Sequence, residues 1–421
     1  MQPHDEVTVT PSAVGASSLP HVSLARLARI AVITVCMVLL ITVPRSASDA
    51  FLGYRVTDPP FTSLTYGIQA FLWWDNGSAG LHMDLIRLMG FSHVKQTFAW
   101  EDIEPVRGEW HLERGDVILD ELERRSLKLV VRLSDAPDWA FPNNVPQTMD
   151  ASLVVDTPPE NLDDWANFCR TVAARYRGRV AAYQIWNEPN LSREWGGQLP
   201  DAAGYVALLR ACSEAIRAVD PDAILISAGL APTGNYDNFA TPDDVYFQQM
   251  YDAGFQQYID VVGVHAPGYT APEVDPADAP GGNRFFSFRR VEDMRRIMVA
   301  NGDAARQMAI LELGWTTDQI HPDMAWFAVT EEEQARNLVA GYQYAAEHWR
   351  PWIGLMSMIY MANPAWTQAD EQYWWSIITP DGYTRQAFID LANMAKFCGD
   401  EVRPVRDPGS PEALGLVPVT P

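Results

Sequence analysis

The sequence predicts an α/β protein built as a single (β/α)8 barrel, the TIM-barrel fold, and three observations support this fold class. Eight short apolar runs typical of buried strands alternate with segments whose apolar residues recur every three or four positions. Strands that alternate with helices form parallel β-α-β units, and eight such units favour a closed barrel over an open sheet. No Gly-x-Gly-x-x-Gly turn follows an early strand, so the sequence offers no support for a dinucleotide-binding sheet.

The expected elements follow one another in order along the chain. We expect strands at residues 67–73, 93–99, 127–133, 181–186, 223–228, 259–264, 308–311 and 355–361. We expect helices at residues 116–124, 161–176, 203–219, 245–251, 291–299, 331–348 and 384–397. Residues 267–283 are rich in Pro, Gly and Asp, which predicts a long loop after the sixth strand that forms one wall of a cleft.

The barrel is expected to occupy residues 51–400, between a leader at 1–50 and a Pro-rich tail at 401–421. A length of 421 residues still allows one catalytic domain, because α/β barrels span about 250 residues or more when they carry insertions. The tail has five prolines from residue 404 onward and little hydrophobic pattern, which is typical of a mobile tail or a linker.

The leader carries an apolar run at residues 30–43, preceded by Arg26 and Arg29 and followed by small residues. This layout predicts an export signal that is cleaved. An uncleaved membrane anchor through residues 24–43 is the alternative, since that stretch reaches the length of about 20 residues needed to span a bilayer. We therefore expect an exported protein, either secreted or anchored to the outer face of the cell membrane.

Composition limits the classes of partner and cofactor. The formal net charge is −23, from 31 basic and 54 acidic residues, which disfavours nucleic acid and other polyanions. Cysteines at 36, 169, 212 and 398 match no zinc spacing, so we expect no metal. Buried free thiols are the default expectation, and one disulfide is the alternative in an oxidising compartment.

Two glutamates end apolar runs and are candidate catalytic residues. Glu188 follows the fourth expected strand in the segment Trp-Asn-Glu-Pro, and Glu312 closes the seventh in the segment Leu-Glu-Leu-Gly-Trp. The carboxyl ends of barrel strands form the face where active sites are built. Two carboxylates on that face, in a chain with 15 tryptophans, indicate chemistry on sugars. We expect burial and the neighbouring carboxylate to raise the pKa of the acid of this pair.

These two segments resemble the signatures of the clan A retaining glycoside hydrolases. Residues 100–105 (Trp-Glu-Asp-Ile-Glu-Pro) and 136–140 (Ala-Pro-Asp-Trp-Ala) are similar to loops after strands two and three in the cellulase-like families 5, 39 and 42. The resemblance covers residues 62–398. Lys95 stands where family 5 members commonly have an arginine beneath the nucleophile, and Leu311 stands where Thr or Ser is frequent. These departures affect the choice of family within the clan, not the clan itself.

The resemblance implies roles for particular residues. Glu188 corresponds to the acid/base, Asn187 to the donor that binds the sugar 2-hydroxyl, and Glu312 to the nucleophile. His265 and Tyr269, after strand six, correspond to substrate-binding and nucleophile-orienting positions, although His265 could equally be a hydrogen-bonded structural residue. No cofactor is implied.

Aromatic residues near the strand ends are candidate stacking surfaces for sugar rings. Trp366 is expected to form the floor of the central subsite. Packing in the core is almost as consistent with the sequence for the other candidates, which are Trp74, Trp100, Trp139 and Trp315. Asp75 could bind sugar hydroxyls or cap a loop.

The sequence thus predicts an enzyme that hydrolyses β-linked glycosidic bonds of an oligo- or polysaccharide with retention of configuration. A sugar-binding surface protein without turnover is the rival class, and a transglycosylase in polysaccharide assembly or export is a third hypothesis. The sugar, the linkage, and internal or terminal cleavage depend on loop shapes that the pattern does not specify.

Overall fold

A computed structural model describes residues 56–75, 77–142, 153–398 and 401–403 of the chain. The predicted leader at 1–50, its candidate anchor at 24–43, and most of the predicted tail lie outside the described residues. Within the described ranges, no helix combines the length and the apolar character that crossing a bilayer requires.

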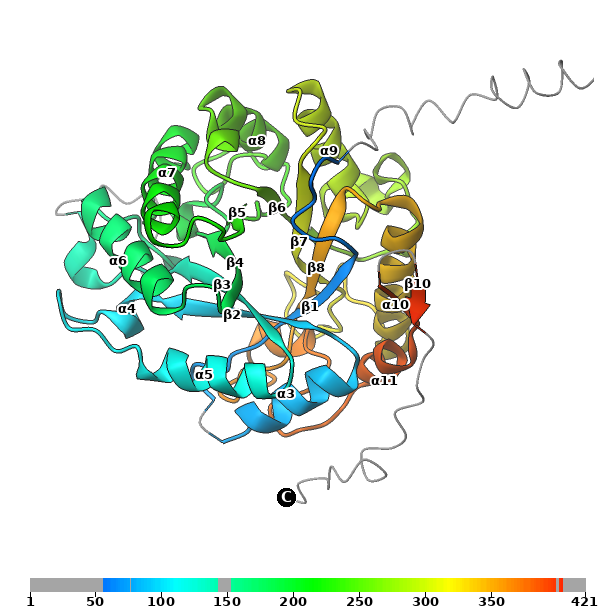
Figure 1. The fold of residues 1–421 in the computed structure, drawn as a ribbon. Coiled ribbons are helices and arrows are strands. Elements are labelled where there is room, and N and C mark those ends of the chain that lie inside the picture. Colours follow the sequence, from blue (N-terminus) through cyan, green and yellow to red (C-terminus); the bar gives the residue numbers. More distant parts are fainter. Residues whose placement is uncertain (1–55, 76, 143–152, 399–400, 404–421) are drawn as a thin grey trace, which may run out of the picture. The chain divides into compact units, whose positions relative to one another are not determined.

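Eight parallel strands close into a barrel in the order β1 to β8, with β8 paired to β1, which confirms the predicted fold class (Figure 1). The strands are β1 (Thr65–Gln69), β2 (His93–Ala99), β3 (Lys128–Ser134), β4 (Val180–Ile185), β5 (Leu225–Ser227), β6 (Val261–Pro267), β7 (Gln307–Gly314) and β8 (Ile353–Met358). Each expected strand corresponds to one of these, with bounds that differ by a few residues.

Helices surround the barrel and follow the strands in sequence (Figure 1). They are α3 (Ala79–Leu88), α4 (Trp100–Ile103), α5 (Glu113–Arg124), α6 (Leu162–Arg175), α7 (Ala202–Val219), α8 (Asp243–Asp252), α9 (Arg290–Ala300), α10 (Glu331–His348) and α11 (Gln386–Asn393). Helix α10 has the predicted bounds because a capping box, Thr330 with Glu333, satisfies the first backbone N–H groups. Helices α3 and α4 were not predicted.

Short 3-10 helices lie in the loops at the cleft and between the longer helices. They are η1 (Asp138–Ala140), η3 (Ser192–Glu194), η4 (Phe255–Gln257), η5 (Pro276–Asp278), η6 (Pro280–Gly282), η7 (Arg284–Phe286) and η8 (Glu371–Trp374). The chain continues after α11 into the antiparallel strands β9 (Lys396–Cys398) and β10 (Glu401–Arg403). The helix predicted at 384–397 is therefore shorter than expected, and the segment predicted as a tail begins with a strand.

The interior of the barrel is filled by side chains from alternate strand positions. Val130, Ala182, Ile226, Val261, Ala309, Leu311 and Leu355 form one buried cluster with Phe61. A larger apolar cluster joins the outward faces of the strands to the surrounding helices. Because both faces of the sheet are covered, the strands are continuous apolar runs, which is the pattern that made them visible in the sequence.

Cys169 of α6 and Cys212 of α7 form a disulfide, with their Cα atoms 5.4 Å apart. The default expectation of free thiols was therefore wrong for this pair. Both residues are fully buried on the faces where α6 and α7 pack together, and a separation of 43 positions hides this proximity in the sequence.

Candidate active site

Irregular backbone positions the two glutamates at the carboxyl ends of the strands. Glu188 follows β4 with φ of 37°, and Trp186 just before it has φ of 69°, both in the left-handed region that non-glycine residues rarely adopt. The pairing of β6 with β7 shifts register at His265, and the pairing of β7 with β8 shifts beyond Ile310. Such shifts re-aim side chains, and they are frequent next to active sites.

Glu188, Glu312 and His265 converge above the barrel core. One side-chain oxygen or nitrogen from each lies within 4.8 Å of the other two. His265 Nδ1 is 2.9 Å from Glu188 Oε1 and 3.8 Å from Glu312 Oε2. The imidazole also lies against Gly229, where a Cβ atom would come within 2.3 Å of His265 Nε2. The ring is therefore held in place between the glutamates and the backbone of the loop after β5.

Lys95 of β2 lies beneath Glu312 and is 1% exposed. Its Nζ donates to Glu312 Oε1 at 3.1 Å and to the backbone oxygen of Leu311 at 3.1 Å. Burial alone would raise the pKa of Glu312, but the positive charge of Lys95, followed by His265, outweighs it and lowers that pKa. Burial also lowers the pKa of Lys95, to about 8, although Glu312 opposes the shift. Glu312 is consequently an ionised carboxylate at neutral pH.

Glu188 has partners on both oxygens. His265 contacts Oε1, and Arg193 Nη2 of η3 donates to Oε2 at 2.9 Å. Burial pushes the pKa of Glu188 upward, yet the hydrogen bond from His265 and the charges of His265 and Arg193 lower it to about 2. The expectation that burial would leave this carboxyl with a raised pKa was therefore wrong, because the sequence did not show that His265 and Arg193 would both contact it.

A cleft of about 900 Å³ opens over these residues. Among the predicted site residues, six line it: Trp74, Asn187, Glu188, His265, Glu312 and Trp366. Gln184 Nε2 donates to Asn187 Oδ1 at 3.3 Å, which fixes the orientation of the Asn187 amide. Trp74 is 39% exposed, so its indole face is available to a ligand.

Several predicted stacking residues lie elsewhere. Trp100 and Trp315 are fully buried, and their indole N–H groups donate to Glu104 and to the Thr270 backbone oxygen, so neither can stack on a sugar. Trp139 donates to the Glu104 backbone oxygen and is covered by Arg107, and it does not line the cleft. These expectations were wrong because a position shortly after a strand does not fix the direction of the side chain.

Two other candidate residues form hydrogen bonds that stabilise loops. The Tyr269 hydroxyl donates to the Pro280 backbone oxygen, which ties the loop after β6 together and keeps Tyr269 out of the cleft lining. Asp75 accepts backbone N–H groups from Gly77 and Ser78 and pairs with His82 at 3.1 Å. Asp75 therefore caps the loop before α3.

The cleft contains charged groups that sequence reasoning did not single out. Arg132 of β3 and Glu194 of η3 line it together with Arg193. Burial, followed by the charge of Glu188, raises the pKa of Glu194 to about 8. An arginine inside an apolar strand is a signal that could have identified Arg132, whereas nothing in the sequence marks Arg193 or Glu194.

The three converging side chains could also coordinate a cation. Glu188, His265 and Glu312 offer two carboxylate oxygens and an imidazole nitrogen at suitable separations. However, Lys95 and Arg193 already place positive charge 3.1 Å and 2.9 Å from these carboxylates. The donor set therefore fits proton transfer and nucleophilic attack by two glutamates better than metal coordination.

Comparison with known proteins identifies the fold. No protein-family model matches the sequence, and no curated protein does. A family 39 glycoside hydrolase from the gut symbiont Bacteroides cellulosilyticus WH2 superposes with a TM-score of 0.58 at 20% identity, over 80% of this chain and 64% of that one. This chain has the fold of the clan A glycoside hydrolases.

Two further solved structures agree. A glucosidase from Croceicoccus marinus gives a TM-score of 0.57 at 12% identity, over 81% of this chain and 69% of that chain. A family 10 endoxylanase from a sugarcane soil metagenome gives 0.52 at 16% identity, over 78% and 97%. The chain spans slightly less than two thirds of the family 39 hydrolase. The predicted resemblance to clan A is confirmed at the level of the fold.

Proposed function

We propose that this protein is a retaining glycoside hydrolase that cleaves β-linked bonds of an oligo- or polysaccharide with Glu312 and Glu188. The observation that carries the proposal is that oxygens of the two carboxylates lie within 4.8 Å of each other at the floor of the cleft. Retaining enzymes hold their two carboxyl groups about 5 to 5.5 Å apart, whereas inverting enzymes leave about 6.5 to 9.5 Å for a water molecule.

The first step forms a glycosyl-enzyme ester. A carboxylate oxygen of Glu312 attacks the anomeric carbon while the bond from that carbon to the glycosidic oxygen breaks. The departing oxygen takes the electron pair and receives a proton from Glu188. The buried charge of Lys95 suits Glu312 to this role, since a nucleophile must be ionised before substrate binds.

The second step releases the sugar. Glu188, now a carboxylate, removes a proton from a water molecule, whose oxygen attacks the anomeric carbon. The ester bond breaks, its electron pair returns to Glu312, and Glu188 is protonated again. Asn187 lines the cleft, which supports a role for its amide in binding a sugar hydroxyl beside this carbon.

A carbohydrate substrate fits the lining of the cleft. Trp74, Trp366 and Trp375 offer aromatic surface, and a volume of about 900 Å³ accommodates more than one sugar ring. Solved structures of the same fold include a glucosidase and an endoxylanase. The disulfide between Cys169 and Cys212 is typical of an oxidising compartment, which supports the proposal that the protein is exported.

The test is release of reducing ends from a panel of β-linked glycans by the purified protein, with Glu312→Gln and Glu188→Gln run beside it. We expect release by the wild type and loss of release in Glu312→Gln. Glu188→Gln should spare activated aryl glycosides, whose leaving group needs no proton, and should lose activity on glycans. Glycan binding without release by the wild type would favour the sugar-binding protein instead.

A further inference from the structure

We infer that Arg193 is a positioning residue that holds Glu188 as an anion before substrate binds and must be displaced by the leaving-group sugar before Glu188 can act as an acid. This inference rests on the proposed function. The relevant observation is that both oxygens of Glu188 are engaged, Oε1 by His265 and Oε2 by Arg193, each at 2.9 Å.

The two partners differ in their freedom to move. The His265 side chain is 2% exposed and lies against Gly229, so Oε1 stays occupied. The Arg193 side chain is 50% exposed on the cleft wall. Oε2 is therefore the oxygen that can be freed, and a proton for the glycosidic oxygen must be carried there.

Two other carboxyl groups lie near Arg193. Glu194 Oε1 is 3.8 Å from Arg193 Nε, too far for a hydrogen bond but close enough to become one after a small rotation. Glu371 of η8, which also lines the cleft, interacts electrostatically with Arg193. After displacement from Glu188, the guanidinium therefore still has the carboxyl groups of Glu194 and Glu371 near it.

The surroundings of Glu188 contain both signs of charge, and Arg193 is the exposed cation among them. The groups that face Glu188, directly or through its contacts, are His265, Arg193, Glu194, Glu312, Lys95, Tyr360 and Arg132. With Arg193 in place, Glu188 cannot carry a proton at neutral pH. With Arg193 displaced, His265 still lowers the pKa of Glu188, but one of the two groups that oppose the effect of burial is gone and Oε2 is free to carry a proton. Binding of the leaving-group sugar would thus be coupled to protonation of Glu188.

The kinetic test compares Arg193→Met, which removes the charge and keeps the length, with Arg193→Lys and with Arg336→Met. Arg336 lies on α10, is 65% exposed and pairs with Glu333, so Arg336→Met is a matched loss of a surface charge. We measure kcat/KM against pH for a phenyl glycoside, whose leaving group needs a proton, and for a glycan.

We expect Arg193→Met to move the basic limb of the pH profile to higher pH and to raise kcat/KM on the phenyl glycoside severalfold at neutral pH. The preference for a sugar leaving group over phenyl should fall, because the variant no longer needs a sugar to free Oε2. Arg193→Lys should be intermediate, and Arg336→Met should match the wild type. A higher KM for the glycan with an unmoved basic limb would overturn the inference and make Arg193 a simple substrate contact.

A second measurement needs no turnover. The unfolding free energies of Glu188→Gln, Arg193→Met and the double variant form a cycle that reports coupling in the empty site. We expect non-additive effects, and additive effects would overturn the pairing. Absence of hydrolysis on every glycan and aryl glycoside would defeat the proposed function and this inference with it, whereas hydrolysis with an unmoved basic limb would defeat this inference alone.

Discussion

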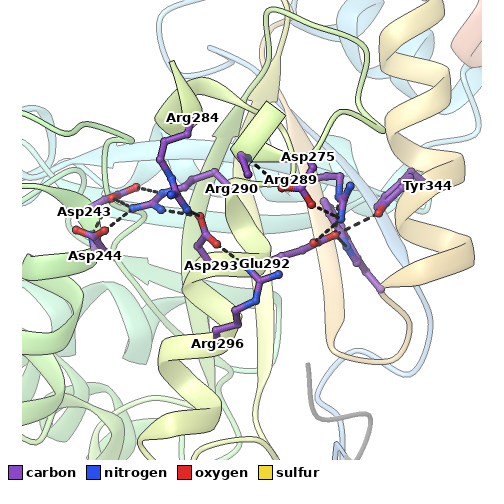
Figure 2. A network of polar contacts seen from close by, with 12 residues as sticks. Asp243, Asp244, Asp275, Arg284, Arg289, Arg290, Glu292, Asp293, Arg296 and Tyr344 are labelled. Carbon is purple, nitrogen blue, oxygen red and sulfur yellow. Dashed lines mark hydrogen bonds and ion pairs between the residues drawn. The ribbon is translucent and has the colours of Figure 1, made fainter. Parts of the chain in front are cut away.

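The cleft at the carboxyl ends of the strands and the outer surface around α9 both carry dense groups of charged side chains, but they balance that charge differently. Around α9, Arg290 is 3% exposed, and its guanidinium reaches Asp243 at 2.6 Å, Asp244 at 2.9 Å and Asp293 at 2.7 Å (Figure 2). One arginine thereby ties α8 to α9.

The rest of the α9 group is built in the same way. Arg289 pairs with Glu292 at 2.9 Å and with Asp275 at 3.3 Å, and Glu292 also accepts hydrogen bonds from Tyr344 and Trp349 (Figure 2). These arginines have fixed partners and cannot lose their protons at any working pH. The arrangement connects elements through arginines whose charge is fixed, although burial raises the pKa of Asp243 to about 6 against the effect of Arg290.

The cleft keeps groups that can change state. Lys95, which can lose its proton, stands beneath Glu312, and the exposed Arg193 stands beside Glu188. The comparison indicates that buried charge with permanent partners serves stability here, whereas charge with titratable or movable partners serves chemistry. Four experiments test this difference between the cleft and the parts of the protein that serve stability.

The largest effect is expected from Glu312→Gln. The variant lacks a nucleophile, so kcat on glycans should fall by at least about 10³-fold. Its stability should change little, because the Lys95 pKa, already lowered by burial to about 8, can fall further and leave a neutral amine. Kinetics and urea unfolding measured on the same preparation check the expected loss of kcat and the expected small change in stability. A large loss of stability would contradict the comparison between the cleft and the α9 group.

Arg290→Met should have the opposite profile. It leaves Asp243 buried without its cation. Because burial already raises the pKa of Asp243 to about 6, this carboxyl can take up a proton, so the cost in the free energy of unfolding should be largest at high pH, at about 3 to 5 kcal/mol. The kcat of the folded protein should remain that of the wild type, since Arg290 is on the outside of the barrel. Chemical unfolding with active-site titration tests this, with Arg336→Met as the control for loss of a surface charge.

Trp366→Ala should weaken catalysis without weakening the fold. Loss of a stacking surface worth about 0.5 to 1.5 kcal/mol should lower kcat/KM on a glycan by up to about tenfold. The contrasting Trp100→Ala, at a fully buried site, should instead destabilise the protein by about 3 to 5 kcal/mol. Equal effects of the two variants on kcat/KM of the folded enzyme would mean that Trp366 does not contact substrate.

The smallest effect is expected in the dependence of stability on pH. The pKa of Glu188 is lowered from 4.5 to about 2 in the folded state. A carboxyl with a depressed pKa contributes stability above its unfolded pKa, and that contribution is lost as pH falls toward the folded value. Between pH 4.5 and about 2, the wild type should therefore lose more stability than Glu188→Gln. Parallel curves in urea unfolding across this range would show that Glu188 is not held as an anion.

The sequence was sufficient to predict the barrel and the two glutamates. Strands buried on both faces must be apolar runs, and strand ends in a barrel share one face, so the positions of Glu188 and Glu312 followed from the chain alone. Asn187 and Trp366 also line the cleft as expected. Helix α10 was predicted with its bounds from apolar residues spaced three and four apart, and a local capping box fixes its start in the structure.

Only the tertiary structure decided which side chains meet. The sequence could not distinguish Trp74, which lines the cleft, from Trp100, which is buried, because irregular backbone beyond a strand sets the direction of each side chain. The pairing of Cys169 with Cys212 required two helices to pack together. The state of Glu188 depends on His265, 77 residues away, and on Arg193, which a 3-10 turn brings back to it. A local pattern determines where a carboxylate stands, but its charge is determined by the neighbours that folding brings to it.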